Sequence, residues 1–150
     1  MSILNAFVTP EVGLIGVDTE AVYPNGSILE VGKVVAAPLI NAVVAFRGTD
    51  YVLKAAIANI VCFGGALEQM VEELPDLIRG SVDYCRKHFQ APEEAMKLEM
   101  ALIGYSQAEG CVVGHLFTRQ VGCEDIRVDR IHSRYRAPFW SEEDLPAGIP

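Results

Sequence analysis

The chain has 150 residues, of which 51% are hydrophobic, and its formal net charge is −8. This length and hydrophobicity suit one domain with a real core and exclude a disordered chain. The negative charge argues against nucleic acid or an anionic membrane surface as the main partner, and no apolar run reaches the roughly 18 residues that a membrane span needs.

The cysteines and the first residues bear on the compartment. The four cysteines form no C-x-x-C pair and no small disulfide framework, and no basic stretch precedes an apolar one as in a secretory signal. We therefore expect a single cytoplasmic domain over residues 1–150.

The first third of the sequence predicts short strands. They cover residues 3–8, 12–17, 27–31, 33–39 and 41–48, and "YPNG" at 23–26 predicts a turn. Asp18 ends the second strand and Lys33 lies in a later one. Because the apolar residues are nearly continuous, we expect sheets that are covered on both faces.

Two helices are predicted next, over residues 49–63 and 66–89. Apolar residues recur there at helical spacing, and Gly64-Gly65 separates the two stripes. The first stripe comprises Val52, Leu53, Ala56, Ile57, Ile60 and Val61. Pro75 interrupts the second stripe and predicts a kink or two abutting helices.

Strands return at residues 97–106 and 111–119, joined by a hairpin turn at "QAEG". Residues 120–150 are expected to be irregular. Five arginines gather near this end, at positions 119, 127, 130, 134 and 136. Acidic residues alternate with them, which favours a solvated, salt-bridged face over an anion site. Strands, then two helices, then strands predict a layered α+β fold.

Two Cys/His pairs raise the question of a metal. Cys85 and His88 would share a helix face, and Cys111 and His115 a strand face, but neither spacing is that of a structural zinc site. We expect buried thiols, no metal and no cofactor.

Four ordered features resemble a known family. They are Asp18 after "VGLIGV", Lys33 in "GKVVAAPL", Gly48-Thr49 before the first helix, and Gly104-Tyr105 in the late hairpin. Over residues 2–118 this order resembles proteasome β-subunits and the bacterial HslV peptidase, which are N-terminal-nucleophile (Ntn) hydrolases. The resemblance implies a proteasome-like Ntn αββα sandwich, with residues 1–118 as the core. It leaves room for an incomplete C-terminal layer beside an irregular charged segment at 119–150.

The resemblance also implies a catalytic site. Ser2 would be the nucleophile, Lys33 its electrostatic partner, Asp18 the anchor of that lysine, and Gly48 the oxyanion donor. The substrate would be a peptide or another amide, and the chain would form a homo-oligomer without a nucleic acid or membrane partner. The alternative is a non-catalytic assembly protein that keeps the fold. Taken singly, Asp18 also suits a strand-end turn and Lys33 an edge-strand guard against aggregation.

Overall fold

The computed structural model describes residues 3–22, 27–48 and 50–137. The predicted "YPNG" turn and Ser2 lie outside these residues. The strands before the helices are β1 (Leu4–Val8), β2 (Gly13–Val17), β3 (Glu20–Val22), β4 (Ile28–Glu30), β5 (Val34–Ala37) and β6 (Ala42–Gly48). The remaining elements are α1 (Asp50–Val61), α2 (Leu67–Phe89), β7 (Leu98–Ser106), β8 (Cys111–Arg119), β9 (Arg127–Arg130) and β10 (Arg134–Ala137), with short 3-10 turns at Pro38–Ile40 and Glu93–Met96.

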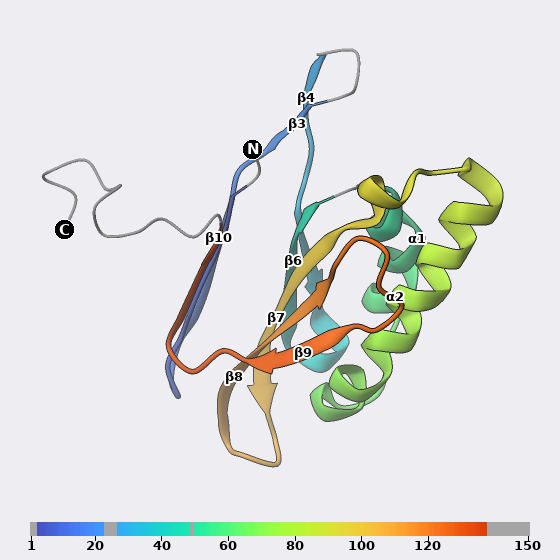
Figure 1. Ribbon diagram of the computed structural model, residues 1–150. Coiled ribbons are helices and arrows are strands. Elements are labelled where there is room, and N and C mark those ends of the chain that lie inside the picture. The colour runs from blue at the N-terminus through green and yellow to red at the C-terminus, as the bar shows by residue number, and fades with distance from the viewer. Residues whose placement is uncertain (1–2, 23–26, 49, 138–150) are drawn as a thin grey trace, which may run out of the picture.

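Three layers follow one another in Figure 1: a small sheet, a larger sheet and a pair of helices. The large sheet is an antiparallel series in the order β5-β6-β7-β8-β9, and the small one has the order β10-β1-β2. The β3–β4 ribbon forms a separate pair between β2 and β5 along the chain, and it projects from the end of the two sheets. The mixed α/β order that the sequence predicts is therefore present.

The hydrophobic core has two parts, one on each face of the large sheet. Between the sheet and the helices, Phe46, Met100 and Phe117 pack against helix residues that include Ile60 and Leu74. Between the two sheets lies a second cluster, which comprises Leu4, Ala6, Val8, Ala45, Ala101, Ile103, Leu116 and Ile131. The central strands are thus covered on both faces, which explains their almost unbroken apolar sequences.

The outer strands do not follow the expectation of double coverage. In β1 buried and exposed residues alternate, and Phe7 and Leu14, which are paired across β1 and β2, are 37% and 59% exposed. Among the described residues no helix covers this face. Alternation of this kind is typical of a sheet with one face toward the core.

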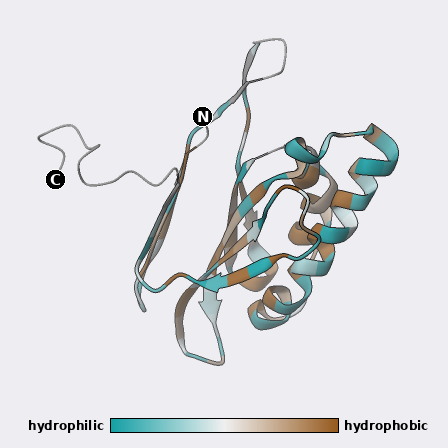
Figure 2. Cartoon of the chain, in the orientation of Figure 1, coloured by the Kyte–Doolittle hydropathy of each residue, from teal (hydrophilic) through white to brown (hydrophobic). Residues whose placement is uncertain are grey.

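Both helices lie where the sequence predicts them, with two differences. α2 continues through Pro75 as one helix, so of the two alternatives expected there, a kink or two abutting helices, the second is wrong. Ile57 is only half-buried, because it lies at the margin of the stripe whose centre is Val52, Ala56 and Ile60. In Figure 2 the brown, hydrophobic segments of the helices gather toward the sheet.

The segment after residue 119 is not wholly irregular. β9 adds to the free edge of β8, with His115 opposite Arg130, and β10 adds to β1, with Ala6 opposite Tyr135. The expectation of an irregular segment over 119–150 is therefore wrong for these two strands, which complete one edge of each sheet.

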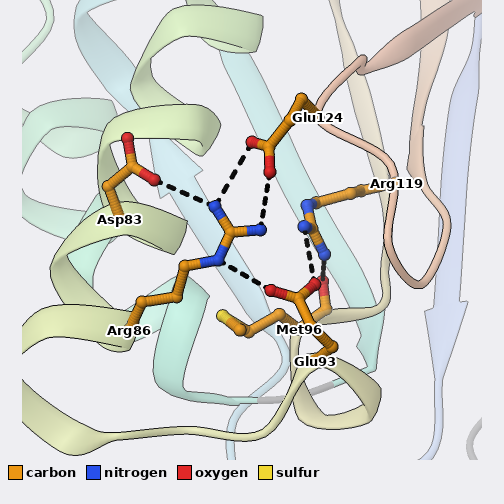
Figure 3. A network of polar contacts seen from close by, with 6 residues as sticks. All are labelled: Asp83, Arg86, Glu93, Met96, Arg119 and Glu124. Carbon is orange, nitrogen blue, oxygen red and sulfur yellow. Dashed lines mark hydrogen bonds and ion pairs between the residues drawn. The ribbon is translucent and has the colours of Figure 1, made fainter.

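Arg119 also departs from the expected solvated face. Its side chain is 1% exposed and donates hydrogen bonds to the Met96 carbonyl at 3.0 Å and to Glu93 at 3.1 Å. Glu93 accepts a second bond from Arg86 at 2.7 Å, and Arg86 also binds Glu124. Figure 3 shows how Glu93 lies between the two guanidinium groups. By contrast, Arg127 is exposed and pairs with Asp129, as expected.

Candidate active site

The sequence-predicted pair Asp18 and Lys33 lies at the base of the β3–β4 ribbon. Asp18 precedes β3 and Lys33 follows β4, and Glu20 pairs with Glu30 within the ribbon. A hairpin brings together the residues just outside its two strands. Asp18 and Lys33 therefore meet although they are 15 positions apart in the sequence. The resemblance predicts the same contact between Asp18 and Lys33. In the structure, the pairing of β3 with β4 is enough to produce it.

The lysine is buried and donates hydrogen bonds to two oxygen atoms. Its side chain is 4% exposed, and Nζ donates to Asp18 Oδ1 at 2.8 Å and to the Glu20 carbonyl at 2.5 Å. An ammonium group removed from water needs such partners, since an unpaired buried charge is strongly unfavourable. Asp18 keeps 20% of its side chain exposed.

Asp18 also contacts the beginning of the chain. The N–H of Ile3 donates to the same Oδ1 atom at 2.9 Å. Burial raises the pKa of Asp18, but the hydrogen bonds from Lys33 and Ile3 and the charge of Lys33 outweigh it and lower the pKa overall. The carboxylate is thus ionised, and it fixes the residue that directly follows Ser2. Ser2 itself lies outside the described residues.

Gly48 is the last residue of β6. Two residues before it, Phe46 makes a second contact with Lys33. The N–H of Phe46 donates to the Lys33 carbonyl at 3.1 Å, which joins β6 to the segment that carries the lysine. Gly48 has φ +126°, and a Cβ atom there would lie 2.3 Å from the Lys97 carbonyl oxygen. Glycine is therefore required at this position by the backbone alone, whatever its role.

A polar cluster that the sequence analysis missed lies beside Gly48. Arg47 pairs with Glu99 at 2.7 Å across β6 and β7, and Glu99 also interacts with Tyr135 on β10. Burial is the main cause that raises the pKa of Tyr135, followed by the nearby Glu99 charge. The cluster joins the two sheets. Its only signal in the sequence is a pair of opposite charges, Arg47 and Glu99, in two strands that could have been expected to be neighbours.

The Cys/His pairs do not form a metal centre in the described part of the chain, where no three His, Cys, Asp or Glu side chains are grouped to hold an ion. Cys85 is fully buried, and burial raises the pKa of its thiol. Within the described residues no helix is both long enough and apolar enough to span a bilayer.

No protein-family model and no curated protein matches the sequence. Solved structures do match. A Gly-1 mutant of Anbu from Hyphomicrobium sp. strain MC1 superposes with a TM-score of 0.59 at 12% identity, over 91% of this chain and 59% of that one. Anbu from Yersinia bercovieri, described as an ancestral beta-subunit, gives 0.58 at 11% identity, over 91% and 60%. This chain thus spans about three fifths of the length of either structure.

These matches correct the family suggested by the sequence. The assignment to proteasome β-subunits or HslV is wrong, because the matching structures belong to Anbu, a proteasome-related but distinct family. At 11–12% identity the likeness shows the fold and nothing about chemistry. The chain therefore has a proteasome-like fold, similar to that of Anbu.

Proposed function

We propose that the protein is an Ntn-type hydrolase of amide bonds with Ser2 as its nucleophile. The observation that supports this most is the pairing of buried Lys33 with Asp18, whose Oδ1 also accepts the N–H of Ile3. The ion pair is thereby held one residue from Ser2. The proteasome-like fold is consistent with a site at this place.

The chemistry needs Ser2 to become the first residue through loss of Met1. Its α-amine, which titrates near pH ~7.7–8.0, would then take the hydroxyl proton. The Ser2 oxygen would form a bond to the amide carbon, and the C–N bond would break as the amine leaves with that proton. Water would release the acyl group in a second step. Lys33 would stabilise the deprotonated oxygen, and the Gly48 N–H the oxyanion.

The test combines a mass measurement with an assay. The intact mass shows whether Met1 is removed, and a set of fluorogenic peptide amides shows turnover. We expect Ser2→Ala to abolish turnover without a change in thermal stability, and Ser2→Thr to retain some of it. A processed protein that cleaves no amide, or one in which Ser2→Ala keeps full activity, would contradict the proposal.

A second candidate is a non-catalytic assembly protein. Asp18 and Lys33 also clamp the base of the β3–β4 ribbon, which is a structural task in itself. One matching structure is described as a beta-subunit, which supports self-association of this chain. Retention of Met1, together with loss of stability in Lys33→Ala, would favour this role.

The proposal includes the four-layer αββα sandwich and a homo-oligomer. The exposed outer face of β1 and β2, with Phe7 and Leu14, is where a further layer would lie. In a background without the exposed Cys62 and Cys123, a soluble maleimide should label a Leu14→Cys variant of the assembled protein slowly if this face is covered. Rapid labelling there would contradict a fourth layer.

A further inference from the structure

The exposed face of α2 is symmetric about its glycine. The residues Glu73, Asp76, Gly80, Tyr84 and Lys87 are spaced by three, four, four and three positions. At 3.6 residues per turn all of them lie within about 40° of Gly80 around the helix axis. All five are exposed. These five positions thus form one exposed stripe along α2, the long helix of the helical layer in Figure 1.

The charges of the stripe are also complementary to those of a second, antiparallel copy of α2. Lys87 stands seven positions after Gly80 and Glu73 seven before it; Tyr84 stands four after and Asp76 four before. In two antiparallel copies of α2 that cross at Gly80, each ammonium would face a carboxylate, and each tyrosine hydroxyl could donate to Asp76. An isologous contact requires this pattern, in which residue i meets j and j meets i.

Gly80 itself suits a close crossing of two helices. It lies in the interior of a 23-residue helix, although glycine is among the weakest helix formers. A Cβ atom at this position would meet nothing within 4 Å, so no contact inside the monomer requires glycine. Without a side chain, a second helix can approach the backbone closely at this point.

A groove with a mixed lining accompanies the stripe. It has a volume of about 770 Å³ and runs between α1 and α2, where Ala55, Leu77, Tyr84 and Phe89 line it together with the polar Lys54, Asn59, Asp76 and Ser81. Tyr84 and Phe89 are 49% and 54% exposed, and their rings meet edge to face at 5.8 Å. Exposed aromatic side chains beside a groove are typical of an interaction surface.

We propose that this face of α2 is a two-fold interface between two copies of the chain, centred on Gly80. The occupant is a second copy because the stripe is complementary to itself. In the contact, Lys87 pairs with the partner's Glu73, and Tyr84 covers the groove beside the partner's Asp76. Asp76 also pairs with Arg79 of its own helix, so the tyrosine adds to an existing ion pair. The interface stands whether or not Ser2 hydrolyses amides.

Charge reversal tests the pairing. Sedimentation of Lys87→Glu should show a dissociation constant raised by about tenfold or more, because like charges then face each other. Glu73→Lys should do the same, and the double variant Lys87→Glu/Glu73→Lys should restore association. Glu72→Lys is the matched control: it makes the same charge change at an exposed residue about 80° away from Gly80, and should change little.

Cross-linking tests the axis. In a background with the exposed Cys62 and Cys123 changed to serine, Gly80→Cys should oxidise to a disulfide-linked dimer, because a two-fold axis brings the two Cβ atoms close. Gln107→Cys in the β7–β8 turn is the control and should stay unlinked. A monomer at all concentrations, or failure of the double reversal to restore association, would overturn the proposal, as would equal linking at both cysteine positions.

Discussion

The Lys33 ammonium lies 2.8 Å from Asp18 Oδ1 and closes the base of the β3–β4 ribbon. The ribbon alone accounts for this closeness. It does not account for the burial of the lysine, at 4% exposure, or for the Ile3 N–H on the same carboxylate oxygen. A hairpin clasp requires neither feature, and both agree with the proposed site at Ser2.

Lys33→Ala should destabilise the fold by about 2–4 kcal/mol, because it leaves Asp18 without its cation. The partial exposure of Asp18, at 20%, keeps the expected loss below that of a fully buried pair. Lys33→Met/Asp18→Asn, which removes both charges and keeps the volume, should recover part of this loss. Urea unfolding measures all three proteins. An unchanged midpoint in Lys33→Ala would show that the pair contributes nothing to stability.

Arg119→Lys should destabilise the protein by about 1–3 kcal/mol, because an ammonium cannot bond both the Met96 carbonyl and Glu93 in the geometry of a guanidinium fork. Arg127→Lys is the matched control, since Arg127 is 77% exposed, and should change stability by less than about 0.5 kcal/mol. Thermal unfolding compares them. Equal melting temperatures of Arg119→Lys and Arg127→Lys would mean that the hydrogen bonds of buried Arg119 do not contribute to stability.

Acid should weaken the fold through Glu93. Hydrogen bonds from Arg86 and then Arg119 lower its pKa from 4.5 to about 2. A carboxyl whose pKa is lower in the folded state stabilises the fold above its unfolded pKa, and this stabilisation is lost as pH falls from about 4.5 to 2. Glu93→Gln should therefore cost stability at neutral pH and lose less between neutral pH and pH about 3. Parallel pH curves for the two proteins in urea unfolding would contradict this coupling.

Sequence periodicity predicted the elements whose side chains form the core. The apolar stripe of α1 and the apolar runs of β6 and β7 are long enough for a helical or strand pattern to be recognised in the sequence. β9 and β10 are four residues each, with three and two charged residues, and they are strands because β8 and β1 offer free edges for pairing. A pattern within four residues cannot show that an edge elsewhere is available.

The candidate site was predictable to a similar extent. The Asp18–Lys33 contact follows from the pairing of β3 with β4, of which the sequence predicted β4 and a preceding turn but not β3. The Glu20 carbonyl that also binds Lys33 is a backbone group and leaves no signal in the sequence. Burial of Arg119 was missed because its partners, Met96 and Glu93, lie 23 and 26 positions away and only the fold brings them together. Charge alternation alone cannot distinguish a buried arginine from a solvated one.

Ile60→Asp should unfold the protein, since Ile60 is fully buried between the helices and the large sheet and an unpaired carboxylate there would cost several kcal/mol. Ile57→Asp, one turn earlier and half-buried, should lower stability without abolishing the fold. Circular dichroism with thermal melting compares the pair. If Ile57→Asp unfolds the protein and Ile60→Asp does not, the buried face of α1 has been placed on the wrong side.

Gly48→Ala should destabilise the fold by about 2–4 kcal/mol, from a strained φ and from a Cβ atom 2.3 Å from the Lys97 carbonyl oxygen. Gly16→Ala in β2 is the control, because its Cβ would meet nothing within 4 Å. Thermal unfolding of the two variants measures the difference, and equal melting would contradict the strain. Since the backbone requires glycine at position 48, loss of amide hydrolysis in Gly48→Ala would not identify an oxyanion donor. That role is tested only if a variant folds, retains bound substrate and fails in turnover.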